Sequence, residues 1–314
     1  MFESIRSCIE QYDTIILHRH SQPDGDALGS QIGLKHLILE NYPHKRVYAV
    51  GDAAGRYAFM QDAPFDDLAD EAYSGALAII LDTGARALIS DNRYTLAAAT
   101  ARIDHHIFCE KIADAEVIET SYESCCGLVT ALALEAGWRI PPIAAQALYT
   151  GTVTDSGRFR YDSTTPDTLR RAAELLAVGI DTAQIYRDLY ADDFSRILLR
   201  SKFVLKVNFT EHNVAYIYTT KEEAAACGVD TFTISRGMVG VMSEIRGVDI
   251  WVNFTETEGG VLCELRSGRY NINPIAVKYG GGGHEKASGA TVESREVAMQ
   301  MLADLDQIME VNQE

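Results

Sequence analysis

The sequence predicts an α/β protein with two domains: an N-terminal domain built on a mostly parallel sheet, and a smaller α+β C-terminal domain joined to it by a helical linker. The chain has 314 residues, which is enough for about two domains of ordinary size. Its first half alternates short, partly β-branched apolar runs with stretches of helical periodicity, the pattern of a parallel sheet. Its last third contains two consecutive alternating strands around a turn instead.

The first domain is predicted to consist of four strands alternating with helices. Each strand is an apolar run that ends at polar residues or a glycine: TIILHRH (14–20), RVYAVGD (46–52), ALAIILDTGA (76–85) and TARIDHH (100–106). Helical periodicity then predicts helices over 26–40, 124–137 and 141–157. Because parallel sheets bind ligands at the C-terminal ends of their strands, the side chains that follow these strands are the candidates for function.

The second half begins with an amphipathic stretch, 181–207, that no proline or glycine interrupts, and this predicts one long connecting helix. A strand over 213–220, two strands around a Glu-Gly-Gly turn within 248–268, a glycine-rich loop and a helix from about Ser294 are predicted to follow. The predicted boundaries are 1–185 for the first domain, 186–207 for the linker and 208–314 for the second domain.

Composition and charge exclude several classes of protein. The formal net charge of −17 disfavours binding of long nucleic acid, which normally needs a broad basic surface. No apolar run approaches the roughly 18 residues of a membrane span, and the N-terminus lacks the pattern of a signal peptide. Six cysteines without C-x-x-C spacing indicate neither a zinc cluster nor a disulfide framework. We therefore expect a soluble cytoplasmic protein.

The segment HRHSQPDGDALGS (18–30) places His20, Asp24 and Asp26 in the loop that leaves the first strand. Pro23 and Gly25 allow the sharp turn that such a convergence needs. Taken alone, the segment is equally compatible with a purely structural role, in which Asp26 caps the following helix and Asp24 occupies the turn.

Acids and histidines also follow three other apolar stretches: Asp82, the run Asp104, His105 and His106, and Asp155. Each has a structural alternative, as a turn residue, a histidine pair or a helix cap. Because four separate elements bring such residues to one edge of the sheet, a metal site is favoured. Carboxylates and imidazoles without thiolate suit Mn²⁺ or a similar ion, and the excess of carboxylates suits two ions. Two ions about 3.5–4 Å apart promote phosphoester hydrolysis.

Four motifs in this order resemble those of the DHH phosphoesterase superfamily: PDGDALGS (23–30), DTG (82–84), DHH (104–106) and TDSGRF (154–159). GGGGHEKASGA (280–290) resembles the signature of the DHH-associated C-terminal domain, DHHA1. Chain length, linker and N-terminal motif are most similar to the nano-RNase branch, whose members act as oligoribonucleases and as phosphatases of 3′-phosphoadenosine 5′-phosphate (pAp). The resemblance spans essentially the whole chain.

The resemblance implies a metal site in the first domain. One Mn²⁺ would be held by His20, Asp24 and Asp82, and a second by Asp26, Asp82, His105 and Asp155, with Mg²⁺ or Co²⁺ as alternative ions. Asp82, His106 and Asp104 are the implied catalytic residues, with Asp82 bridging the two ions. His106 would face the scissile phosphate, and Asp104 would orient the histidines.

The implied substrate-binding residues lie mainly in the second domain: Arg266, Ser267, Gly282, Gly283 and His284. A surface ion pair is the alternative for Arg266, and a flexible turn for the glycines. Arg158 of the first domain is a further candidate, with a salt bridge to Asp162 as its alternative. Phe159, Tyr270 and Tyr279 are candidates for stacking on a base, or else for packing.

The resemblance implies a phosphoesterase that hydrolyses short RNA oligonucleotides of two to five nucleotides to mononucleotides and converts pAp to AMP. We expect no long nucleic acid or membrane as a partner, and a homodimer as the candidate assembly. Three alternatives remain: a cyclic-dinucleotide or pApA phosphodiesterase, an exopolyphosphatase or pyrophosphatase, and a non-catalytic nucleotide-binding regulator.

Overall fold

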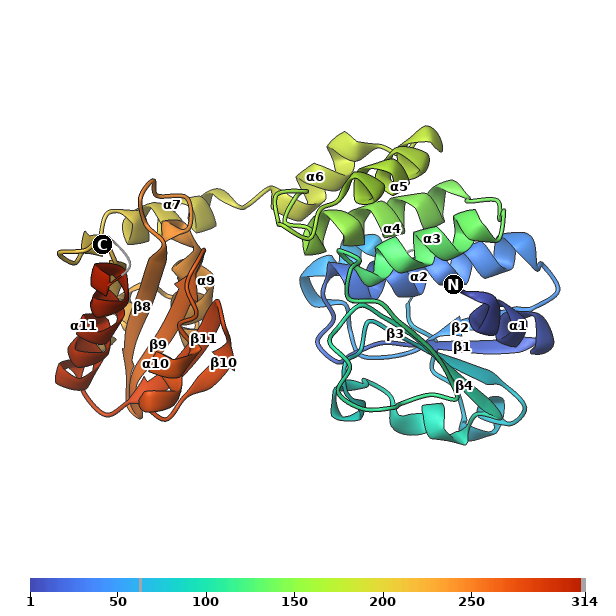
Figure 1. Ribbon diagram of the computed structural model, residues 1–314, viewed down its shortest axis with the longest axis horizontal. Coiled ribbons are helices and arrows are strands. Elements are labelled where there is room, and N and C mark those ends of the chain that lie inside the picture. The colour runs from blue at the N-terminus through green and yellow to red at the C-terminus, as the bar shows by residue number, and fades with distance from the viewer. Residues whose placement is uncertain (62–63, 312–314) are drawn as a thin grey trace. The chain divides into compact units, whose positions relative to one another are not determined.

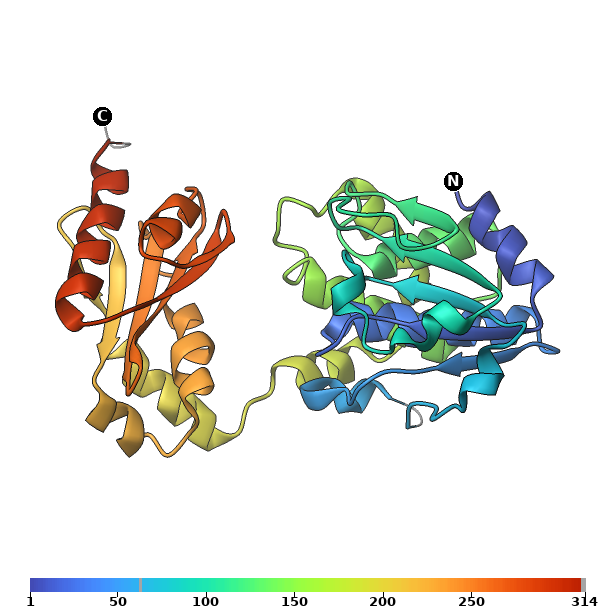
Figure 2. The same ribbon diagram turned by 90° about the horizontal axis from the view of Figure 1, so that it is seen from below.

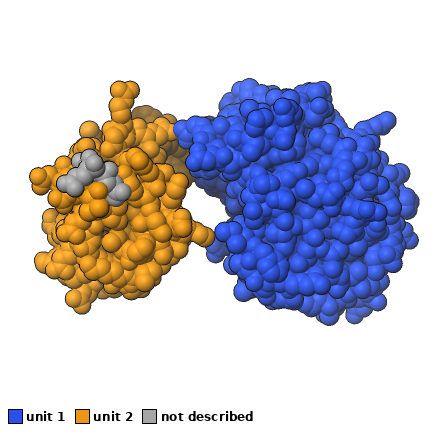
Figure 3. All heavy atoms as spheres, viewed as in Figure 1, with its two compact units in different colours: residues 1–191 blue, residues 192–314 orange. Residues whose placement is uncertain are grey.

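The computed structural model describes residues 1–61 and 64–311. The chain divides into two compact units, Met1–Ala191 and Asp192–Glu314, which Figure 3 shows in different colours. Within the described residues, none of the helices combines the length and the apolar character needed to cross a bilayer. All six cysteines lie in the described part of the chain as free thiols.

The first unit is built on a five-stranded, all-parallel sheet in the order β2-β1-β3-β4-β5. Its strands are β1 (Thr14–His18), β2 (Arg46–Ala49), β3 (Leu77–Leu81), β4 (Ala99–Asp104) and β5 (Ala115–Ile118). Its α-helices are α1 (Glu3–Gln11), α2 (Gly25–Asn41), α3 (Cys125–Glu135), α4 (Pro142–Asp155), α5 (Pro166–Ala177) and α6 (Thr182–Tyr190). The α/β class and the mostly parallel sheet predicted from the sequence are confirmed.

The α-helices cover one face of this sheet, as Figure 1 shows. The main core lies between them and alternate strand residues such as Ile15, Leu17 and Ile79, all fully buried. Loops and short 3-10 helices cover the opposite face, among them η2 (Asp70–Tyr73) and η4 (Asn92–Leu96). Strands buried on both faces explain the continuous apolar runs of the sequence.

Helix α2 packs closely against α4, and glycines make that approach possible. A Cβ added at Gly29 would lie 2.5 Å from the carbonyl oxygen of Ala147, closer than atoms can pack.

The residue that caps α2 is Asp24, whereas the structural alternative for this loop required Asp26. Asp24 is the N-cap and accepts hydrogen bonds from the N–H groups of Asp26 and Ala27, so Asp26 is free for another role.

The predicted single connecting helix over 181–207 is wrong. Two helices, α6 and α7 (Phe194–Val204), are separated by extended backbone at Ala191 and Asp193. The reason is tertiary: Ile185 of α6 packs in the core of the first unit, whereas Leu199 and Phe203 of α7 pack in the second. Periodicity alone does not reveal that two halves of one amphipathic stretch belong to different cores.

The second unit contains a six-stranded mixed sheet in the order β10-β11-β9-β8-β7-β6, in which only β7 and β8 pair in parallel. Its strands are β6 (Asn208–Phe209), β7 (Ala215–Thr219), β8 (Ile250–Thr257), β9 (Gly260–Ser267), β10 (Gly282–His284) and β11 (Ala287–Val292). Its α-helices after α7 are α8 (Lys221–Ala226), α9 (Thr231–Val239), α10 (Asn273–Lys278) and α11 (Arg295–Val311).

The two faces of this second sheet are covered unequally. Helices α10 and α11 pack along one face, and α7 and α9 pack on the other, over β7 and β8 (Figures 1 and 2). The glycine-rich segment at 280–290, predicted as a loop, instead forms β10 and the first part of β11, an antiparallel pair. The strand pattern is hidden there because glycines carry no alternating side chains.

Candidate metal centre

The candidate site lies at the topological switch point of the parallel sheet. The chain passes from β1 outward to β2 and then returns to β3 on the other side of β1, which opens a crevice at the carboxyl ends of these strands. His20 follows β1, Asp82 follows β3, and the run beginning at Asp104 ends β4. Asp82 has a φ of +49°, a conformation that is uncommon for residues other than glycine and is typical of functional turns.

His105 lies at the centre of one group of carboxylates. Its Nε2 is 3.4 Å from Asp82 Oδ1, 3.7 Å from Asp26 Oδ2 and 3.5 Å from Asp155 Oδ2. Its Nδ1 is 3.4 Å from the carbonyl oxygen of Tyr122. A backbone acceptor at one ring nitrogen leaves the other free as a ligand, as in most metal-binding histidines.

His20 is arranged in the same way beside the other carboxylate oxygen of Asp82. Its Nε2 is 3.5 Å from Asp82 Oδ2 and 3.8 Å from Asp24 Oδ1, while its Nδ1 is 2.8 Å from the carbonyl oxygen of Ser21. Each Asp82 oxygen thus faces a different histidine. The structure therefore brings together all six residues that the sequence suggested as metal ligands. They form three overlapping groups: His20, Asp24 and Asp82; Asp82, His105 and His106; and Asp26, His105 and Asp155.

Asp26 is held by an element that the sequence did not connect to it. Its side chain is buried, and its two oxygens accept hydrogen bonds of 2.7 and 2.8 Å from the N–H groups of Cys125 and Cys126 at the start of α3. The free N–H groups and positive end of a helix favour a carboxylate there. A segment about 100 residues away in the sequence thus fixes the position of this carboxylate.

A separate series of side-chain contacts orients His106. Asp104 is fully buried and lies between Arg102, whose Nη2 pairs with its Oδ2, and His106, whose Nδ1 is 2.7 Å from its Oδ1. Because Asp104 occupies Nδ1, the Nε2 of His106 remains available to a ligand. The predicted orienting role of Asp104 is compatible with this geometry for His106, whereas His105 is oriented by the backbone of Tyr122.

The electrostatics of the site favour a bound cation. Burial raises the pKa of Asp155 to about 7, and the negative charge of Asp82 adds to this effect against the opposing His105. Burial also raises the pKa of Asp26 well above its usual range. Burial opposes the ionised form of Asp82, but the rings of His105 and His20 outweigh it and hold its pKa below the usual range.

The donor set fits divalent metal ions. Asp82 Oδ1 is buried and makes no hydrogen bond within the described part of the chain, an arrangement that a cation would complete. The other ligand candidates are carboxylates and imidazoles whose free atoms converge within 4.8 Å of one another in each group. Oxygen and nitrogen donors in this proportion suit Mn²⁺ or Mg²⁺ better than a structural zinc ion.

In the second unit, cross-strand register brings two of the predicted substrate-binding residues into one row. Arg266 of β9 pairs with Ala287 of β11, which in turn pairs with His284 of β10. Arg266 is also held by Glu264, whose Oε2 lies 3.2 Å from its Nη2. Gly282 lies two residues further along β10, in the row that contains Gly289 and Glu264.

Other predicted substrate-binding residues have different surroundings. Ser267 is buried, and its Oγ accepts hydrogen bonds from the N–H groups of Arg269 and Tyr270, so it supports the turn after β9. Gly283 has a φ of +134°, and its carbonyl oxygen accepts a hydrogen bond from Asn273. Arg158 of the first unit lies over the ring of Tyr190, 4.5 Å from its centre.

The three aromatic residues considered for stacking on a base are partly buried and pack against the cores of their units. Phe159 packs against the main core of the first unit, with its ring 6.0 Å from that of Tyr149. Tyr270 and Tyr279 pack against the core beneath α10 and α11.

The sequence did not point to Phe232, an exposed aromatic residue on α9 at the other face of this sheet. It belongs to no motif, and only its spacing from Arg236 signals a pair on one helix face.

Comparison with known proteins supports the same interpretation across the chain. Residues 14–152 match the DHH family N-terminal domain, and residues 224–311 match the DHHA1 domain. The chain is 36% identical over 307 residues to the bifunctional oligoribonuclease and PAP phosphatase NrnA of Bacillus subtilis, covering 97% of each chain. It is 34% identical to the protein of the same name from Mycoplasma genitalium, covering 95% of this chain and 94% of that one.

A solved structure also resembles the whole chain. An exopolyphosphatase-related protein from Bacteroides fragilis superposes with a TM-score of 0.85 at 27% sequence identity, covering 98% of this chain and 97% of that one. The two domain matches, the full-length identity to NrnA proteins and the shared fold agree with the grouping of acids and histidines at the switch point. The chain therefore belongs to the DHH family, in the NrnA branch that combines a DHH domain with a DHHA1 domain.

Proposed function

We propose that this protein is a phosphoesterase that hydrolyses oligoribonucleotides of two to five nucleotides to mononucleotides and dephosphorylates pAp to AMP. The observation that carries the proposal is the set of overlapping ligand groups at the switch point, linked to one another through Asp82 and His105. Full-length similarity to proteins named as oligoribonucleases and PAP phosphatases supports this choice of substrates.

Two Mn²⁺ ions are the proposed cofactors, with Mg²⁺ or Co²⁺ as alternatives. One would be held by His20, Asp24 and Asp82, and the other by Asp26, Asp82, His105 and Asp155. Such ions, when bound, make a water molecule more acidic and stabilise negative charge on a phosphate. The rigid attachment of Asp26 to α3 and of both histidines to backbone carbonyls keeps the ligand atoms in place.

The chain's own residues complete the proposed reaction. His106, held by Asp104 at Nδ1, presents Nε2 to an oxygen of the scissile phosphate and stabilises the charge that develops there. Arg266 and His284 of the second unit, with the backbone N–H group of Gly283, are proposed to bind a further phosphate of the substrate. Gly282 and Ser267 are proposed as further parts of the substrate-binding surface. Arg158 is proposed as an additional contact to the substrate.

A substrate panel under one Mn²⁺ condition tests the function. Release of phosphate or mononucleotide would be measured for pAp, pApA, a diribonucleotide, cyclic di-AMP and pyrophosphate. We expect pAp and the diribonucleotide to have the highest kcat/KM values. Faster hydrolysis of cyclic di-AMP or pyrophosphate would instead support one of the two alternative phosphoesterase activities, and nucleotide binding without turnover would support a regulator.

Substrate length is expected to matter strongly. The chain has 45 acidic residues against 28 lysines and arginines, so a long polyanion would meet net repulsion beyond the few cations of the site. We expect at least a tenfold lower kcat/KM for an RNA of about 20 nucleotides than for a diribonucleotide of the same base. The two rates would be compared at equal concentrations of termini and at two salt concentrations. Equal rates would contradict the expectation.

Metal affinity is expected to depend on pH. Although burial opposes protonation, neighbouring carboxylates raise the pKa of both His20 and His105 to about 10 in the metal-free protein. Both rings therefore hold protons at neutral pH, and a metal ion must displace these protons. The apparent affinity for Mn²⁺ should rise as pH increases from about 6 to about 9. Calorimetric titration in two buffers of different ionisation enthalpy would measure the released protons. An affinity independent of pH would contradict this assignment of ligands.

Two further expectations accompany the proposal. A cytoplasmic location remains a prediction from the sequence. A homodimer is likewise proposed, and light scattering coupled to size-exclusion chromatography would measure the mass of the assembly.

A further inference from the structure

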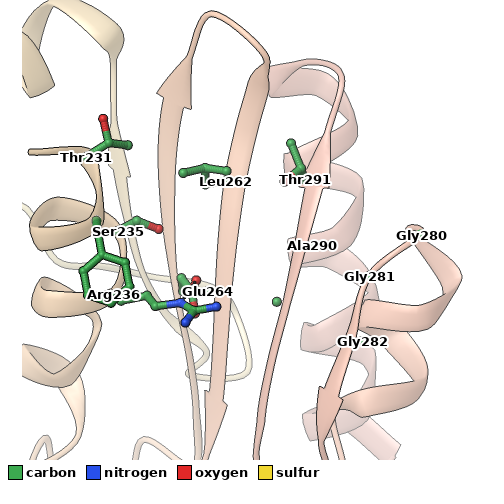
Figure 4. Close-up of a pocket in the computed structure, with 12 residues that line it drawn as sticks. Thr231, Ser235, Arg236, Leu262, Glu264, Gly280, Gly281, Gly282, Ala290 and Thr291 are labelled. Atoms are coloured by element: carbon green, nitrogen blue, oxygen red, sulfur yellow. Dashed lines mark hydrogen bonds and ion pairs between the residues drawn. The ribbon is translucent and has the colours of Figure 1, made fainter. Parts of the chain in front are cut away.

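The second unit carries a groove of about 710 Å³ on the sheet face that α9 only partly covers. Figure 4 shows Arg236 and Glu264 on one side of this groove and Gly280, Gly281 and Gly282 on the other. The groove lies over β9, β11 and β10, beside α9, which packs on β8 and β9. We call it the α9 groove.

Part of the floor of the α9 groove has no side chains. Gly282 of β10 pairs with Gly289 of β11, which pairs with Glu264 of β9, so two of the three positions in this row are glycines. A Cβ added at Gly282 would meet no heavy atom of the described residues within 4 Å, so the space above this glycine is open. Adjacent glycines in paired strands expose flat peptide planes, on which a planar ring can lie.

The wall of the groove combines an aromatic ring with charged groups. Phe232 on α9 is 65% exposed and lines the groove, so its ring is accessible to a ligand. The Arg236 guanidinium lies 5.5 Å from the centre of its ring. Arg236 Nε is also 2.9 Å from Glu264 Oε1, so the arginine is positioned from two sides. An aromatic face and an ordered arginine are the elements with which proteins bind unpaired bases.

The groove lies next to the row that contains Arg266 and His284. Positions two residues apart along a strand are separated by about 7 Å. The glycine row is therefore displaced from the Arg266 row by a distance comparable with that between the phosphate and the base of one nucleotide. Glu264 connects the two rows, since it pairs with Arg236 through one oxygen and with Arg266 through the other.

We propose that the α9 groove binds the nucleobase of the substrate, with Phe232 stacking on it, Arg236 at its edge and the glycines beneath it. The inference rests on the proposed function and deepens it, because it assigns the substrate class by its base. Inorganic pyrophosphate and polyphosphate have no group that would use this surface. The groove therefore favours nucleotides over the phosphate-only substrates of the alternative activities.

The test compares Phe232→Ala with Phe209→Ala in the full-length protein. Phe209 is 50% exposed but lies on β6, at the opposite edge of the sheet from β10, so it controls for loss of an exposed ring. Each variant would be assayed with Mn²⁺ on pAp and on 2-deoxyribose 3′,5′-bisphosphate, which lacks the base. We expect Phe232→Ala to raise KM for pAp about tenfold, because the variant loses the ring on which the base stacks. KM for the base-free compound should not change.

Two further variants test the geometry. Phe232→Tyr keeps the stacking face and should restore KM for pAp to within about twofold of the wild-type value. Gly282→Leu should raise KM for pAp at least as much as Phe232→Ala, because its side chain would occupy the open space above the floor. An equal rise of KM for both substrates in Phe232→Ala, or no rise for either, would overturn the proposal.

Failure of the proposed function gives a different result. If wild-type protein hydrolyses neither compound, the phosphoesterase assignment fails, and the groove is then tested by equilibrium dialysis with AMP. Weaker binding of AMP to Phe232→Ala than to wild type and Phe209→Ala would support the base site. Equal binding to all three proteins would overturn it.

Discussion

Replacing Asp82 by asparagine is expected to lower kcat for pAp by about three powers of ten, because several kcal/mol of transition-state stabilisation depend on the metal ions. Asp82 belongs to two of the three ligand groups, and its two oxygens face different histidines, His20 and His105. Asparagine has nearly the same shape but keeps one carbonyl oxygen and no negative charge. The variant should therefore fold while losing the bridge between the two groups.

The measurement combines kcat at saturating Mn²⁺ with the number of ions bound per chain. Wild type should bind two ions, and Asp82→Asn should bind fewer. Asp114→Asn is a matched control, because Asp114 bonds to Thr100 at the beginning of β4, away from the carboxyl edge that carries the site. A variant of Asp82 that retained more than about a tenth of the wild-type kcat would refute the bridging role.

Replacing Asp104 by asparagine should affect both stability and activity. Asp104 and Arg102 are both fully buried and form an ion pair, so the substitution leaves the guanidinium without its main partner. Breaking a buried pair costs about 3–5 kcal/mol. We expect a loss near 3 kcal/mol in the free energy of unfolding, because Glu116 Oε1 remains 3.5 Å from the same guanidinium. The loosened His106 should lower kcat about 10- to 100-fold.

A double variant separates these two effects. Arg102→Met together with Asp104→Asn removes the unpaired charge and should recover most of the lost stability, measured by urea unfolding of the metal-free protein. It should not recover kcat, since His106 still lacks its carboxylate partner. If kcat instead returned together with stability, Asp104 would have only a structural role.

Much of the candidate site could be predicted because its residues occur in short motifs at the ends of predictable strands. Apolar runs locate β1, β3 and β4, and parallel strands bring their carboxyl ends to one edge, so His20, Asp82 and His105 were expected to meet. The sequence did not predict that Asp24 caps α2 while Asp26 is held by the start of α3. Which acid caps α2 depends on hydrogen bonds that α3, far away in the sequence, makes with Asp26.

The sequence by itself thus determined the α/β class, the order of the main strands and helices, and the residues of the candidate metal centre, because periodicity and strand-end motifs are local properties of the chain. Only the tertiary structure decided where the connecting stretch breaks, since α6 and α7 bury their apolar sides in different cores. It alone also revealed the α9 groove. Phe232 and Gly282 are about 50 residues apart, and only strand register and helix packing bring such residues to one surface.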